Sequence, residues 1–125
     1  MCSSDLRDTS ANCEVKCFDS SANQYLVMGA LIAAGLDGVK RNLRLPAEFP
    51  DDPASHPEDE LAEKGVKRLP MSLGDSLERL EADAVLKEAM GSMLFGAFAA
   101  VRRAELEFFA EMDPDAVAAA HRWRY

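Results

Sequence analysis

Two oppositely charged side chains, Glu14 and Lys16, stand two positions apart near the start of the sequence. The segment around them alternates, with Cys13, Val15 and Cys17 on one predicted face and Glu14, Lys16 and Phe18 on the other. This period of two predicts a β-strand, on which residues i and i+2 share a face about 7 Å apart. A carboxylate and an ammonium group so placed have the chemistry to hold a cation and an anion side by side. Taken alone, however, such a pair is typical of a solvated strand face.

A buried helix is predicted directly after the strand. Residues 19–21 break the alternation, and Ser21 followed three positions later by Gln24 is a capping-box pattern. The residues that follow are apolar on nearly every side of a helix: Tyr25, Leu26, Val27, Met28, Ala30, Leu31, Ile32, Ala33, Ala34 and Leu36. Such a helix belongs in the interior of something larger. Asp37-Gly38 interrupts the apolar run, although residues 39–43 could extend the helix.

The rest of the chain is predicted to be a loop followed by helices. Residues 46–70 form an acidic, proline-rich loop that should lie over a surface. A short turn of helix is expected near residues 58–63, and His56 is expected to be solvated and without a role. Residues 72–125 are predicted to be helical.

Within the helical part, the predicted N-caps are Ser72, Asp83 and Asp113. The second of these helices is expected to close at Gly91, and the longest helix to run over residues 92–112. Glu105 falls on the apolar stripe of the longest helix. Its predicted role is an ion pair with Arg102, one turn earlier.

Composition narrows the class of protein. The length of 125 residues suits one domain or less, and the formal net charge of -8 argues against nucleic acid or an anionic membrane as a partner. No run is expected to reach the length of a membrane span, and the polar start does not resemble a signal peptide. We therefore predict a cytoplasmic protein.

The cysteines offer no site. On a strand, Cys13 and Cys17 would lie about 13 Å apart, which is too far for a disulfide. A Cys-x-x-x-Cys pattern without further ligands is a poor zinc signal. Both are predicted to be small buried hydrophobic side chains.

Residues 1–6, Met-Cys-Ser-Ser-Asp-Leu, fit nothing that follows. They resemble a translated sequencing-adapter end and are expected to be non-native; an ordinary frayed terminus is the alternative. Both interpretations predict that these residues pack against nothing. The expected division is a terminus over 1–6 and a domain portion over 7–125.

The segment Glu-Val-Lys-x-Phe-Asp-x-x-Ala-Asn-x-Tyr-Leu at 14–26, with Ala-Ala-Gly-Leu-Asp-Gly at 33–38, resembles the C-terminal part of the glutamine synthetase catalytic domain. That family carries Glu-x-Arg or Glu-x-Lys on a strand, then Asp-x-x-x-Asn-Pro-Tyr-Leu at the start of a buried helix. The resemblance covers roughly residues 12–125, and only loosely in the middle loop. It implies a mainly α fold with one N-terminal β-strand, as a C-terminal fragment of the α+β catalytic domain.

The resemblance also implies a reaction. Glutamine synthetases are ATP-dependent ligases that join ammonia to the γ-carboxylate of glutamate through γ-glutamyl phosphate, with Mg²⁺ or Mn²⁺, in ring-shaped homo-oligomers. The residue matching Glu14 is a metal ligand in the family, and the one matching Lys16 contacts substrate or phosphate. The sequence departs from the family pattern at two positions. Many members have Arg where this chain has Lys16, and the nodulin-like and polyamine-ligating branches have Lys there. At Gln24 the family has Pro.

Two alternatives stay open. One is a fragment of a γ-glutamyl-amine ligase, in which a larger amine such as a polyamine replaces ammonia. The other is a non-catalytic helical interaction module. Because the remaining carboxylates, the phosphate-binding arginines and any Gly-rich loop are absent from the sequence, this chain alone is expected to be inactive.

Overall fold

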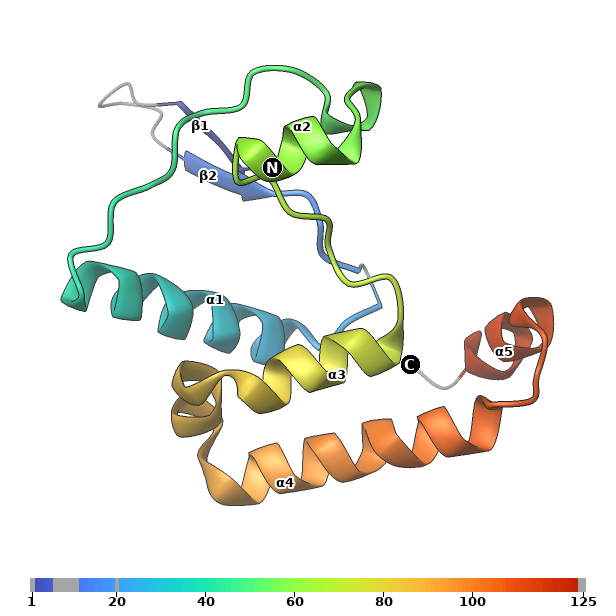
Figure 1. The fold of residues 1–125 in the computed structure, drawn as a ribbon. Coiled ribbons are helices and arrows are strands. Elements are labelled where there is room, and N and C mark those ends of the chain that lie inside the picture. The colour runs from blue at the N-terminus through green and yellow to red at the C-terminus, as the bar shows by residue number, and fades with distance from the viewer. Residues whose placement is uncertain (1, 6–11, 20, 124–125) are drawn as a thin grey trace. The chain divides into compact units, whose positions relative to one another are not determined.

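The computed structural model describes residues 2–5, 12–19 and 21–123, and this part of the chain is mainly helical, as predicted (Figure 1). In order, the elements are β1 (Cys2–Asp5), β2 (Asn12–Val15), α1 (Gln24–Lys40), η1 (Pro53–Ser55), α2 (Glu58–Glu63), α3 (Leu73–Ala82), α4 (Ala84–Phe109) and α5 (Pro114–His121). The chain divides into two compact units. One contains residues 1–32 and 112–125, and the other contains residues 33–111.

The two strands form an antiparallel hairpin in which Ser3 stands opposite Glu14, and Cys2 opposite Val15. This corrects the expectation that residues 1–6 pack against nothing, because the backbone of β1 pairs with β2; Leu6 lies outside the described residues. It also corrects the expected strand length. The strand ends at Val15 because its pairing with β1 ends there, and an unpaired extension has no ladder hydrogen bonds to hold it. The proposed non-native origin of residues 1–6 stays a prediction.

The cysteine prediction is wrong for Cys17, which is exposed. It follows the end of β2 in a turn, where no sheet face exists to bury it. The side chain of Cys13 lies outside the described ones.

Helix α1 runs through Asp37-Gly38 and ends two residues later. The Leu43 N–H donates to the Gly38 carbonyl at 2.9 Å, and the Asn42 N–H donates to the Val39 carbonyl at 3.1 Å. With Asn42 at φ 50°, this is a Schellman ending with asparagine in the usual position of glycine. Glycine at position 38 therefore did not terminate the helix, because the left-handed residue stands four positions later.

The apolar side chains of α1 are not covered within the described part of the chain. No α1 residue is buried, and Tyr25 is 89% exposed. The other large exposed side chains of the helix are Met28, Leu31, Ile32, Leu36 and Val39. The prediction that this helix belongs in a larger interior stays a prediction.

Helices α3 and α4 pack against each other within the second unit (Figure 1). The predicted cap of α3 is confirmed, since the Asp75 N–H donates to Ser72 Oγ at 3.0 Å. Among the described residues, the buried hydrophobic side chains are Leu77 of α3, 6% exposed, and Ala99 of α4, 1% exposed. Arg103 of α4 also pairs with Glu81 of α3. A small apolar contact with a charged edge thus joins the two helices.

Helix α4 is interrupted at Gly91, as predicted, where φ is 71° and ψ is 161°. The Asp83 side chain caps its start by accepting the Leu86 N–H at 2.9 Å. Its last residue is Phe109, three residues before the predicted end. The predicted pair is present, with Arg102 Nε 3.0 Å from Glu105 Oε2.

By length and apolar composition alone, α4 could cross a membrane, which corrects the expectation that no run reaches that length. The core helix of a compact domain passes the same test. Ala99 of α4 is buried, α4 packs against α3, and the helix breaks at Gly91. Only 6% of its apolar window is buried, however, whereas a core helix is mostly buried. The absence of a membrane partner stays a prediction.

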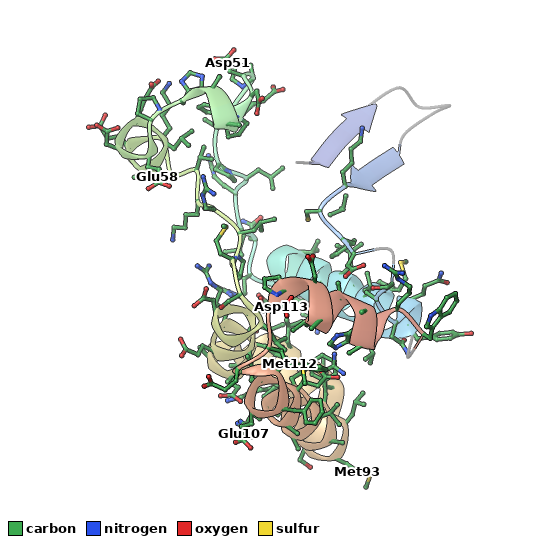
Figure 2. The ribbon with its side chains drawn as sticks, turned by 90° about the vertical axis from the view of Figure 1, so that its right-hand side faces the viewer. Asp51, Glu58, Met93, Glu107, Met112 and Asp113 are labelled. Carbon is green, nitrogen blue, oxygen red and sulfur yellow. The ribbon has the colours of Figure 1, made fainter. Side chains whose placement is uncertain are left out.

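Helix α5 starts with the predicted Asp113-Pro114 pair. The side chain of Asp113 accepts the N–H groups of Asp115 and Ala116 at 3.0 and 3.1 Å. Proline suits the first helical position because its missing N–H would have had no helical partner. Figure 2 shows Asp113 next to Met112 at this junction.

The acidic loop contains more local structure than its composition suggests. Its compact part holds η1 and α2, with Asp51 before the first and Glu58 at the start of the second (Figure 2). Helix α2 covers residues 58–63, where a short helix was expected. Asp52 helps to fold the segment, because its side chain accepts the Ala54 N–H at 3.0 Å.

His56 is not simply solvated, which corrects the prediction from sequence. Its Nδ1 lies 3.2 Å from Glu60 Oε2, and its Nε2 lies 3.6 Å from Asp51 Oδ2. The ring also meets Phe49 edge-on at 5.2 Å. Hydrogen bonds from Lys64 and then from His56 lower the pKa of Glu60. The local turns bring these groups together, although none of them stands out in a loop of this composition.

We predict opposite effects of alanine at two glycines of α4. Gly91→Ala should destabilise the chain by about 1–3 kcal/mol, because its φ and ψ are essentially restricted to glycine. Gly96→Ala should stabilise it by about 0.5–1 kcal/mol, since the site is helical and an added Cβ meets no atom within 4 Å. Urea unfolding followed by circular dichroism measures both. Equal stability of the two variants would mean that α4 does not require the break.

Candidate functional site

The candidate site residues Glu14 and Lys16 lie at the end of the hairpin. The backbone of Glu14 belongs to β2, and its side chain is outside the described ones. Lys16 is exposed and lies in the turn one residue past the end of β2. In this structure the two residues therefore do not share a regular strand face. Their roles as metal ligand and as substrate or phosphate contact stay predictions.

A tight turn at Asp19 follows the candidate residues. Asp19 Oδ1 accepts two hydrogen bonds from Ser21, from the backbone N–H at 2.8 Å and from Oγ at 2.7 Å. The Asp19 carbonyl accepts the Ala22 N–H at 3.1 Å. The backbone bond from Ser21, followed by its hydroxyl bond, lowers the pKa of Asp19. Asp19 is thus an ionised carboxylate that closes a turn of the Asx type.

Asn23 then starts helix α1. Its Oδ1 accepts the N–H groups of Tyr25 at 3.0 Å and Leu26 at 3.2 Å, and its carbonyl accepts the Val27 N–H at 3.0 Å. Asn23 is therefore the N-cap, and the predicted capping box at Ser21 is wrong. The Ser21 hydroxyl is bonded to Asp19 instead. The sequence could have predicted this N-cap, because asparagine is among the preferred N-cap residues and Asn23 directly precedes the first helical residue.

The described side chains do not form a complete site for a divalent cation. Among the described side chains, no three His, Cys, Asp or Glu gather where they could hold a metal ion. Mg²⁺ demands near-octahedral oxygen coordination, and Glu14 would supply one such ligand. The carboxylate of Glu14 is chemically suited to such an ion, and its role as a metal ligand stays a prediction.

We predict that Asn23→Ala weakens the first turn of α1 by about 1 kcal/mol, because two N–H groups lose their acceptor. Amide hydrogen exchange at Tyr25 and Leu26 in the 125-residue chain measures this. Asn23→Asp should keep the protection, since the carboxylate accepts the same bonds. Ser21→Ala should leave these two amides unchanged. Similar loss of protection in Ser21→Ala and Asn23→Ala would restore the capping box.

Comparison with known proteins gives one consistent family. The family described as glutamine synthetase, catalytic domain, matches residues 4–119. The gamma-glutamylpolyamine synthetase GlnA3 of Streptomyces coelicolor is 45% identical over 120 residues, which are 96% of this chain and 26% of that protein. The protein fluG of Emericella nidulans is 43% identical over 82% of this chain and 12% of its own length. A glutamine synthetase of Clostridium saccharobutylicum is 35% identical over 79% of this chain and 22% of its own length.

The chain spans about a quarter or less of the length of each of these relatives. The match nevertheless extends over nearly all of the chain, including the hairpin strand β2, the Asp19 turn and every helix through most of α5. The chain belongs to the glutamine synthetase family, as a part of its catalytic domain.

Proposed function

We propose that this chain is part of an ATP-dependent ligase that joins an amine to the γ-carboxylate of glutamate through γ-glutamyl phosphate. The observation that supports this most strongly is the catalytic-domain match over residues 4–119. The motif Glu14-x-Lys16, followed by the turn at Asp19 and the capped helix, falls within that match. The chain's own part in the reaction is to supply one carboxylate and one cationic side chain.

The roles of these two residues follow from charge. Glu14 is an oxygen ligand for Mg²⁺ or Mn²⁺, which when bound neutralises phosphate charge during phosphoryl transfer. Lys16 places a positive charge near the substrate carboxylate or the transferred phosphate. Such a contact accelerates a reaction when it stabilises charge that develops in the transition state. A lysine does this as a point charge, without the paired donors of arginine.

The first candidate for the amine is ammonia, as in the relatives named glutamine synthetase. The second is a polyamine. One observation favours it: the relative named gamma-glutamylpolyamine synthetase is 45% identical over 96% of this chain. The glutamine synthetases of Pyrococcus woesei and Clostridium saccharobutylicum are 42% identical over 65% and 35% identical over 79% of it. Assaying the full-length protein with ammonia and with putrescine or spermidine, and comparing kcat/KM, separates the two.

The complete protein is proposed to be a cytoplasmic homo-oligomer of ring shape. The family match supports the ring, and the location is carried over as an expectation from the sequence. The exposed apolar side chains of α1 also support a larger structure around this chain, because exposed apolar patches of this kind mark interaction surfaces.

The 125-residue chain alone should make no γ-glutamyl amide from glutamate, ATP and amine. It offers one candidate metal ligand where the reaction needs several, and the described side chains contain no metal-binding group of three. A coupled assay for ADP release, with the full-length protein as the positive control, measures this. Turnover by the 125-residue chain would contradict the proposal.

In the full-length protein, Glu14→Ala should weaken the binding of one divalent metal ion and nearly abolish ligation, because the metal takes part in phosphoryl transfer. Lys16→Ala should lower turnover more than metal affinity, by about 3–4 kcal/mol in the activation free energy. Lys16→Arg should be the mildest change, because many relatives resemble that state. Metal titration and steady-state rates measure these effects.

Glu48→Ala and Lys67→Ala are matched controls, because each removes one exposed charge from the acidic loop outside the proposed site. Both should leave turnover within about twofold, as surface changes usually do. Normal turnover in Glu14→Ala would end the assignment of Glu14 as a metal ligand.

A further inference from the structure

The turn at Asp19 connects the candidate site to the rest of the catalytic domain. Only Cys17 and Phe18 separate Lys16 from Asp19, and only Ala22 separates Ser21 from the helix cap Asn23. Asp19 and Asn23 both accept hydrogen bonds in this short stretch. Asp19 accepts three hydrogen bonds, and Asn23 accepts another three.

These hydrogen bonds hold the segment that follows the candidate site, from Asp19 to the first turn of α1. Asp19 holds residues 21 and 22 through its side chain and its carbonyl, and Asn23 holds the first turn of the helix. The turn that the chain enters three residues after Lys16 is therefore tied to the start of α1. Catalytic groups must be held within a fraction of an ångström, and a misplacement of 1 Å costs about a hundredfold in rate.

We propose that Asp19 is a positioning residue, whose carboxylate fixes the turn that places Lys16 relative to α1. This rests on the proposed function for its catalytic consequence, although the turn itself is a property of the structure. The hydrogen bonds from Ser21 also keep this carboxylate ionised by lowering its pKa. An ionised carboxylate is the stronger acceptor, since bonds to charged groups are shorter and stronger than neutral ones.

The other role open to a carboxylate here is direct contact with the metal or substrate. The two roles differ in what they require of the side chain. Positioning needs an acceptor at Oδ1, which asparagine also provides in Asx turns. Direct action on a metal needs the negative charge, which asparagine lacks. Asp19→Asn and Asp19→Ala therefore separate the two roles.

The experiment measures kcat, KM and Mg²⁺ affinity for three variants of the full-length protein, Asp19→Asn, Asp19→Ala and Ser21→Ala. Asp19→Ala should lower kcat about ten- to a hundredfold with nearly unchanged Mg²⁺ affinity. Asp19→Asn should stay within about threefold of the original rate. Ser21→Ala keeps the backbone donor and should fall between them. It also provides a milder test if Asp19→Ala fails to fold.

A second readout does not depend on catalysis. Amide hydrogen exchange at Ser21 and Ala22 in the 125-residue chain should speed up in Asp19→Ala and stay slow in Asp19→Asn. If the full-length protein shows no ligation, the proposed function fails, while this exchange still tests the turn. Equal loss of rate in Asp19→Asn and Asp19→Ala would overturn positioning in favour of direct action. Normal rate or unchanged exchange in Asp19→Ala would overturn it as well.

Discussion

Four of the five α-helices that the structure describes start at side-chain oxygens that accept the backbone N–H groups of their first turns; α2 has no such cap. Asn23, Ser72, Asp83 and Asp113 do this for four helical starts. The first N–H groups of a helix have no partner within the helix, and leaving them unpaired costs free energy. Each cap lies within three residues of the donors that it satisfies. These helix starts are therefore defined locally, without help from distant parts of the domain.

Few hydrophobic side chains are buried in the described part of this chain. In its described part, the buried hydrophobic side chains are Leu77 and Ala99, in the packed pair of α3 and α4. Apolar burial stabilises by about 25 cal/mol per Å², so a contact of this size offsets little of the entropy lost on folding. The apolar side chains of α1 are exposed instead. This distribution fits a chain that spans a quarter or less of its relatives and whose helices are packed by other parts of a catalytic domain.

The candidate residues Glu14 and Lys16 directly precede the Asp19 turn and the capped start of α1. A carboxylate and an ammonium group act on a phosphoryl transfer only when they are held in place, because misplaced charges stabilise no transition state. The Asp19 turn and the Asn23 cap fix the start of α1 within nine residues of chain, directly after the candidate residues. In the proposed function, the remaining metal ligands belong to other parts of the catalytic domain.

The sequence by itself determined the family, the mainly helical class, the caps at Ser72, Asp83 and Asp113, the break at Gly91 and the Arg102–Glu105 pair. The three caps and the ion pair join residues at most three positions apart, so the residue types and their spacing suffice to predict them. Only the tertiary structure decided the pairing of β1 with β2, the end of β2 at Val15 and the exposure of Cys17. A strand ends where its partner ends, and a side chain is buried only where another segment covers it. Both depend on the path of the chain, which the local pattern of residues does not specify.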